Sequence, residues 1–182
     1  MHFENQSAVH KTLEKIVHRL DELGISYAIA DGMALFFHGY RRFTEDVDIL
    51  VTEEGLWNIH RQLEGLGYVL PFEGSKNLRD AEYGVRIEFL VAGQYPGDGK
   101  PKPVSFPLPE DVGGVRCLQL AKLIELKLAS GTAPGRLRDL GDVQELIRIL
   151  ELPADFSEQL NPFVQDSYSQ LWKDVQKIPP ET

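Results

Sequence analysis

Two hydrophobic periods alternate along this chain, and this alternation constrains its fold more than any other feature. Short apolar runs typical of strands are interleaved with segments whose apolar residues recur every three or four positions, as on one face of a helix. This order predicts an α/β (α+β) fold with a sheet of about five strands flanked by helices. The strand-like runs are residues 25–30, 47–51, 68–72, 85–91 and 115–118, and the helical segments begin near residues 7, 33, 52, 121, 140 and 162.

The length of 182 residues suits one domain, or one domain with a helical extension. Residues 93–114 are rich in Gly and Pro and predict a long ordered loop. We therefore expect a sheet domain over residues 1–118. C-terminal helices over residues 119–182 would pack on it as one compact unit.

Composition and charge exclude several functional classes. A net charge of −9 argues against an extended DNA-binding face, although Lys127, Arg136 and Arg138 lie close enough in sequence to line a local basic pocket. The polar N-terminus and the lack of an apolar run of roughly 20 residues predict a cytoplasmic protein with no membrane segment. Cys117 is the single cysteine, so neither an internal disulfide nor a cysteine zinc site is expected.

Asp46 and Asp48 carry the clearest chemical signal. They stand two residues apart at the start of an apolar run, so on a strand their side chains project from the same face. Their Cα atoms would lie about 6.6 Å apart, which is twice the rise per residue. Carboxylates at this spacing can hold one metal ion or bridge two, and hard oxygen ligands favour Mg²⁺ or Mn²⁺ over zinc.

A glycine turn and a short helix precede this acidic pair. Gly32 follows the apolar run that ends at Ala30, and a helical pattern begins at Met33. A glycine at such a turn lets phosphate approach backbone N–H groups at a helix N-terminus. The acidic pair on a neighbouring strand would then hold a metal ion bound to the same phosphates.

The stretch ADGMALFFHGYRRFTEDVDILV, residues 30–51, resembles the signature of the DNA polymerase β-like nucleotidyltransferase superfamily, in its bacterial minimal and AbiEii-like branches. Those proteins carry a Gly-Gly or Gly-Ser turn, a short helix, and then Thr-x-Asp-x-Asp on a strand. Gly32 matches the second residue of the turn, and Thr44 to Asp48 match the strand motif. The resemblance implies a nucleotidyltransferase-type mixed sheet with a C-terminal helical segment.

Further residues match the superfamily in chain order between residues 25 and 150. The resemblance implies that Asp46, Asp48 and Glu88 are catalytic and bind the metal ion, which would be Mg²⁺ or Mn²⁺. It also implies that the nucleotide contacts Gly32, Thr44, Lys127 and Arg138; Asp139 and Asp142 accompany Arg138, and we interpret both as acids that favour the start of a helix. The expected function is transfer of an NMP from an NTP to an acceptor that the sequence does not identify, whether tRNA, protein or small molecule.

Two departures from the superfamily pattern keep other functions open. Asp31 stands where the first glycine of the turn is expected and places a carboxylate near an anionic triphosphate, and Glu88 stands where Asp is more usual. An alternative is therefore a catalytically inactive nucleotide- or partner-binding module of the same fold, of the toxin–antitoxin type. An Asp-x-Asp glycosyltransferase fits less well, because 182 residues leave little room for the larger sheet domain expected of those enzymes.

Overall fold

A computed structural model describes residues 2–109 and 116–180, with side chains from residue 8 onward. These residues fall into two compact units. The first comprises the described parts of Met1–Phe37, Arg41–Gly93 and Pro107–Leu118, and the second comprises those of His38–Tyr40, Gln94–Phe106 and Gln119–Thr182. Residues 38–40 and 94–106 belong to the second unit, and the division into residues 1–118 and 119–182 stays a prediction. The packing of the C-terminal helices on the sheet stays a prediction.

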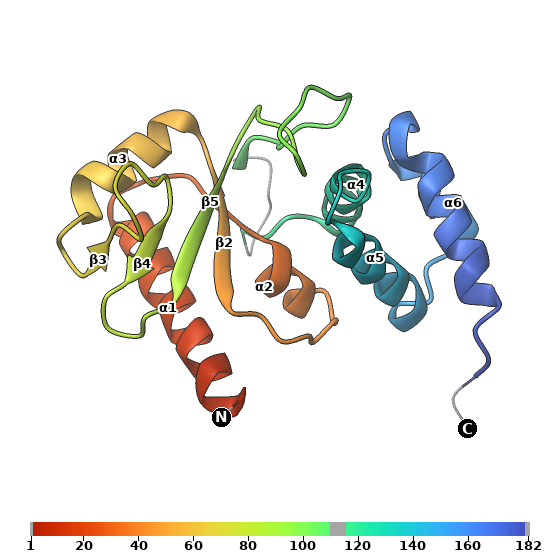
Figure 1. Ribbon diagram of the computed structural model, residues 1–182, viewed down its shortest axis with the longest axis horizontal. Coiled ribbons are helices and arrows are strands. Elements are labelled where there is room, and N and C mark those ends of the chain that lie inside the picture. The colour runs from red at the N-terminus through yellow and green to blue at the C-terminus, as the bar shows by residue number, and fades with distance from the viewer. Residues whose placement is uncertain (1, 110–115, 181–182) are drawn as a thin grey trace. The chain divides into compact units, whose positions relative to one another are not determined.

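The first unit is built around a mixed sheet that has five strands within the described residues (Figure 1). The strand order is β1-β2-β5-β4-β3; β2 and β5 run parallel, and the other neighbouring pairs are antiparallel. The predicted α/β class with a mixed sheet of about five strands is therefore confirmed. The strands are β1 (Ala28–Ala30), β2 (Asp46–Val51), β3 (Tyr68–Val69), β4 (Leu78–Asp80) and β5 (Arg86–Val91).

One strand differs from the sequence-based prediction. The polar stretch at residues 78–80 forms β4, whereas Cys117 makes only an isolated bridge with Ile29. Val115, which the predicted strand included, lies outside the described residues. The alternation rule misses β4 because Leu78 and Asp80 are both buried, and a buried aspartate stands where the rule expects an apolar residue.

Alternation on the two central strands separates the core from the acidic residues. On β2 and β5 the odd-numbered positions are buried, with Val47, Ile49, Ile87 and Phe89 fully so. Helices α1 (His2–Glu22) and α3 (Glu53–Leu63) pack apolar side chains into the same cluster. Each fully buried Leu, Ile or Phe contributes about 1.5–3 kcal/mol, so this face is fixed and the even-numbered side chains project to the other one.

Two helices of the first unit, α2 (Asp31–Phe37) and α3, lie next to strands β1 and β2 in the sequence. Helix α2 follows β1 directly and contacts β1 and β2. Helix α3 begins where Thr52 caps it, because the Thr52 hydroxyl oxygen accepts a hydrogen bond of 2.9 Å from Gly55 N–H. The sequence-based prediction of a helix that begins near residue 52 is confirmed.

The second unit is helical, with α4 (Leu120–Ser130), α5 (Leu137–Ile149), a 3₁₀ helix η2 (Ala154–Gln159) and α6 (Pro162–Gln176). Helix α6 begins as predicted, with Pro162 in its first turn after the Asn161 cap. Residues 94–106 form a loop of this unit, and Asn161 Nδ2 donates to the Pro103 carbonyl at 3.4 Å. In the part of the chain that the structure covers, no helix combines the length and apolar content needed to cross a membrane.

Candidate functional site

The Asp-x-Asp motif opens β2, and strand alternation sends both carboxylates to the face opposite the apolar core. Asp46 is half-buried at the first position of the strand, and Asp48 is only 7% exposed. The intervening Val47 is fully buried in the core. Because the core anchors Val47, the strand cannot rotate to expose Asp48 without losing its packing.

Glu88 reaches the acidic pair from the neighbouring strand. The parallel register of β2 and β5 makes Glu88 the partner of Asp48, and the two side chains share a hydrogen bond. Adjacent strands lie about 4.8 Å apart, so the carboxyl groups are first neighbours. The sequence places Glu88 only on the face away from Val85, Ile87 and Phe89; the register brings it beside Asp48.

Burial and mutual repulsion shift the ionisation of these acids. Burial is the largest cause that raises the pKa of Asp48 well above its ordinary value, and the negative charges of Asp31, Glu88 and Asp46 add to it. Burial and Glu88 also raise the pKa of Asp46, while Arg86 opposes the rise. Desolvation of the carboxylates is therefore the dominant cause, and mutual repulsion adds to it.

Asp31 is a further member of this acidic group. Its backbone φ is +45°, in the left-handed region that favours glycine, although it carries a side chain. The Arg42 guanidinium lies 3.4 Å from the Asp31 carboxylate. The sequence treats Asp31 only as a departure from a glycine turn; its influence on Asp48 depends on how α2 packs against β1 and β2.

Gly32 and Thr44 fit together closely. A Cβ atom at Gly32 would lie 2.5 Å from Thr44 Oγ1 and 2.8 Å from Thr44 Cβ, both well inside contact distance. Thr44 is buried, and its hydroxyl donates a hydrogen bond of 3.2 Å to the Asp46 carbonyl. The structure thus gives both residues a packing role that orients the start of β2. Their contact with nucleotide stays a prediction.

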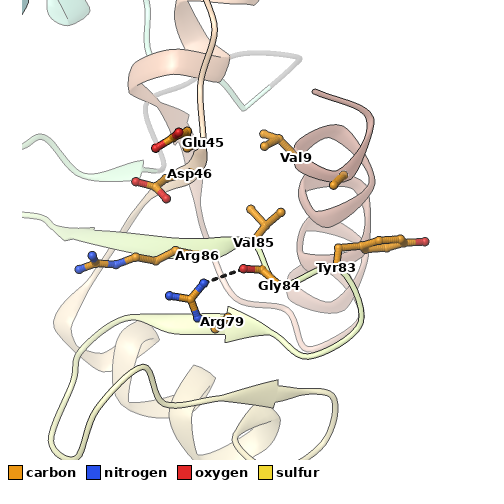
Figure 2. A pocket seen from close by; sticks show the side chains of 9 residues that line it. Val9, Glu45, Asp46, Arg79, Tyr83, Gly84, Val85 and Arg86 are labelled. Carbon is orange, nitrogen blue, oxygen red and sulfur yellow. Dashed lines mark hydrogen bonds between the residues drawn. The ribbon is translucent and has the colours of Figure 1, made fainter. Parts of the chain in front are cut away.

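A pocket of about 450 Å³ opens beside Asp46, within the first unit (Figure 2). Arg79 of β4 and Arg86 of β5 line it, and their guanidinium groups lie on the same side of the sheet as the Asp46 carboxylate. Sequence reasoning missed both arginines. Their signal is visible only in the pairing of the strands, which makes Arg79 and Arg86 direct neighbours.

Lys127 and Arg138 belong to the second unit, on α4 and α5. The Lys127 side chain is 5% exposed, and its ammonium donates to Asp142 at 2.8 Å and to Asp139 at 3.3 Å. Asp139 also accepts a bond of 2.6 Å from Ser130. These two acids therefore bind a buried lysine, beyond the helix-start role inferred from the sequence. The roles of Lys127 and Arg138 in nucleotide binding stay predictions.

The donor set at the strand start suits a hard divalent cation. Asp46, Asp48 and Glu88 offer only carboxylate oxygens, and a cation would relieve the repulsion that raises the pKa of Asp48. Among the described residues, however, no three His, Cys, Asp or Glu side chains form a preformed metal-binding group. The metal-ligand roles of these three acids stay predictions.

Comparison with solved structures assigns the fold. The antibiotic-resistance factor ANT(2'')-Ia superposes with a TM-score of 0.58 at 14% sequence identity, over 94% of this chain and 96% of that one. This chain has a nucleotidyltransferase fold. An antigenic nucleotidyltransferase-like protein from Paracoccidioides brasiliensis is also similar, with a TM-score of 0.48 and 17% identity over 93% of this chain and 94% of that one. The sequence matches no known protein-family model and no curated protein.

Proposed function

We propose that this chain is a metal-dependent nucleotidyltransferase, which transfers an NMP from an NTP to an acceptor hydroxyl or phosphate. One observation carries the proposal: Asp46, Asp48 and Glu88 meet on one face of two parallel strands, within a nucleotidyltransferase fold. The burial of Asp48 beside two other acids costs folding free energy, and a functional role for the three acids explains why the cluster is kept. Binding a cation and the phosphates attached to it supplies that reason.

The proposed cation is Mg²⁺ or Mn²⁺, held by Asp46, Asp48 and Glu88. When bound, it would neutralise phosphate charge and help to align the α-phosphate for attack. Gly32, Thr44, Lys127 and Arg138 belong to the proposal as residues that steady the nucleotide.

In the proposed reaction, Glu88 is the general base. The acceptor oxygen forms a bond to the α-phosphorus, the bond from that phosphorus to the bridging oxygen breaks, and pyrophosphate leaves. Glu88 takes the proton from an acceptor hydroxyl. The strand register holds its carboxyl group beside Asp48, on the face where the proposed cation would bind.

A second function remains open because of Asp31. Its carboxylate adds a negative charge next to Asp48, where an anionic triphosphate is expected. This observation favours a nucleotide- or partner-binding module without transfer activity, of the toxin–antitoxin type. Membership of the bacterial minimal or AbiEii-like branch and a cytoplasmic location are further parts of what we propose.

Metal binding is the first test of the proposal. Calorimetry with Mn²⁺ should show binding to the wild-type protein that is lost in the double variant Asp46→Asn, Asp48→Asn. A matched control replaces two acids of the second unit that are not part of the cluster, Glu158→Gln and Asp174→Asn, and should bind Mn²⁺ as the wild type does. Equal affinity in the wild type and the Asp46, Asp48 variant would remove the ligand assignment.

Glu88→Gln decides between the enzyme and the binding module. The protein is incubated with each radiolabelled NTP, Mg²⁺ and cell extract, and label transfer is followed. We expect transfer in the wild type, its loss in Glu88→Gln, and NTP affinity within a few-fold, because a general base acts mainly in the transition state. NTP binding without transfer in the wild type would favour the binding module, and undiminished transfer in the variant would exclude Glu88 as the base.

A further inference from the structure

Three charged side chains from three adjacent strands form a row where β2 and β5 begin. Asp46 of β2 is the register partner of Arg86 of β5, and Arg86 is the partner of Arg79 of β4. Because paired residues project to the same face, all three charged groups lie on the side that also carries Glu88. Figure 2 shows the two guanidinium groups beneath the Asp46 carboxylate, at the pocket beside it.

Two arginines in directly opposite positions repel each other and destabilise a sheet, and here the Asp46 charge offsets part of that repulsion. Among the residues that the structure describes, Arg79 donates a hydrogen bond only to a neutral group, the Gly84 carbonyl, from Nη1 at 2.7 Å. Arg86 Nε is buried and makes no hydrogen bond to any residue within the described ranges, and its ion pair with Glu88 Oε1 is long, at 3.4 Å. In the described part of the chain, neither guanidinium therefore has a bidentate anionic partner, which is the arrangement that such a group binds best.

We propose that Arg79 and Arg86 bind the phosphate group of the acceptor, so that the acceptor is a small phosphorylated compound with a free hydroxyl. This inference rests on the proposed transferase function. A volume of about 450 Å³ suits a small molecule, and the net charge of −9 disfavours a polynucleotide. Phosphate fits the pair because its oxygens accept from two guanidinium forks at once.

The position of the pocket links this binding to the chemistry. Asp46 lines the pocket, and Glu88 lies two residues along β5 from Arg86. A compound anchored by its phosphate at Arg79 and Arg86 directs its hydroxyl toward these two carboxylates. Anchoring converts the encounter of acceptor and nucleotide into a reaction within one complex, which accounts for much of the rate in phosphoryl transfer.

The test begins with inorganic phosphate and uses the full-length protein without nucleotide or metal. Two-dimensional NMR follows the Nε–H signals of Arg79 and Arg86 and the amide signal of Gly84. We expect saturable shifts in the wild type and at least tenfold weaker binding in Arg79→Gln and Arg86→Gln. The control Arg61→Gln removes a charge that lies over the Trp57 ring on α3, away from the pocket, and should bind as the wild type does.

Two further arms identify the source of the phosphate. Glycerol 3-phosphate should shift the same signals whereas glycerol should not, and saturating ATP should leave the phosphate shifts in place. Competition by ATP at these signals would assign the site to the phosphates of the nucleotide and overturn the acceptor assignment. Arg79 is exposed, so Arg79→Gln tests the site even if Arg86→Gln fails to fold.

Shifts that are absent, or equal in all variants, would also overturn the inference. Loss of NMP transfer would not produce either result, because the binding readout needs no nucleotide and no metal. Failure of this inference and failure of the proposed function are therefore separate outcomes.

Discussion

The buried carboxylate of Asp80 connects strand β4 to the first helix, and the removal of one of its hydrogen bonds gives a quantitative prediction. Asp80 of β4 is fully buried, and its two oxygens accept hydrogen bonds of 2.8 Å from Thr12 and Lys15 of α1. Glu82 N–H adds a third bond, of 3.0 Å. Asp80 directly follows Arg79, so this network also fixes one wall of the pocket.

The network determines the ionisation of Asp80. Burial acts to raise its pKa, but the hydrogen bonds from Lys15 and Thr12 outweigh burial and lower the pKa below its ordinary value of 3.8. A group whose folded pKa is lowered stabilises the fold above its unfolded pKa, and this contribution is lost as the pH falls through the folded value. The hydrogen bonds to Asp80 therefore contribute fully to the free energy of unfolding at neutral pH, and they contribute progressively less below about pH 4.

Thr12→Val removes one of these bonds with little change in shape. Thr12 is fully buried, so water cannot replace its hydroxyl at the Asp80 carboxylate. A hydrogen bond to a charged group contributes about 1.5–3 kcal/mol, and the added buried methyl of valine returns less than about 1 kcal/mol. We expect the free energy of unfolding to fall by about 2 kcal/mol at pH 7.

Urea unfolding followed by circular dichroism measures this loss, with the slope m unchanged between the proteins. Thr132→Val is the matched control: Thr132 is exposed and its hydroxyl donates only to the Ala129 carbonyl, so we expect a change below about 0.5 kcal/mol. The reasoning is refuted if Thr12→Val costs no more than this control. It is equally refuted if the cost is the same at pH 7 and at the lowest pH at which the protein stays folded.

Three more substitutions test other contacts. The fold raises the pKa of Asp48, so the protonated side chain stabilises the folded protein below pH 3.8, and this stabilisation is lost as the pH rises through the folded pKa. Asp48→Asn should therefore be more stable than the wild type at pH 8, as measured by urea unfolding without metal. Gly32→Ala should cost about 1–3 kcal/mol by overpacking against Thr44, and adding Thr44→Ala should recover part of the loss; additive costs would contradict the contact. Lys127→Met should lower the unfolding free energy by about 3–5 kcal/mol at pH 7, because it removes the ammonium that forms an ion pair with the buried Asp142, and Asp142→Asn in the same chain should restore much of it.

The sequence by itself determined the elements with a clear local signal. The alternation over residues 85–91 gives both β5 and the face that carries Glu88, because side chains on a strand alternate whatever the strand pairs with. The cap at Thr52 and the Pro162 start of α6 follow from backbone groups within the first helical turn. The fold class follows from the order of these elements.

Contacts between distant residues were decided only by the tertiary structure. No local period reveals β4, because its buried Asp80 is stabilised by α1, 65 and 68 residues away in sequence. In the same way, strand register alone brings Glu88 to Asp48 and Arg79 to Arg86. Sequence patterns assume that charged residues are exposed and lie apart from like charges, so they do not predict a buried charge or a pair of like charges. The free-energy cost of such charges is offset by partners that the fold supplies, so such residues become visible only when those partners are in place.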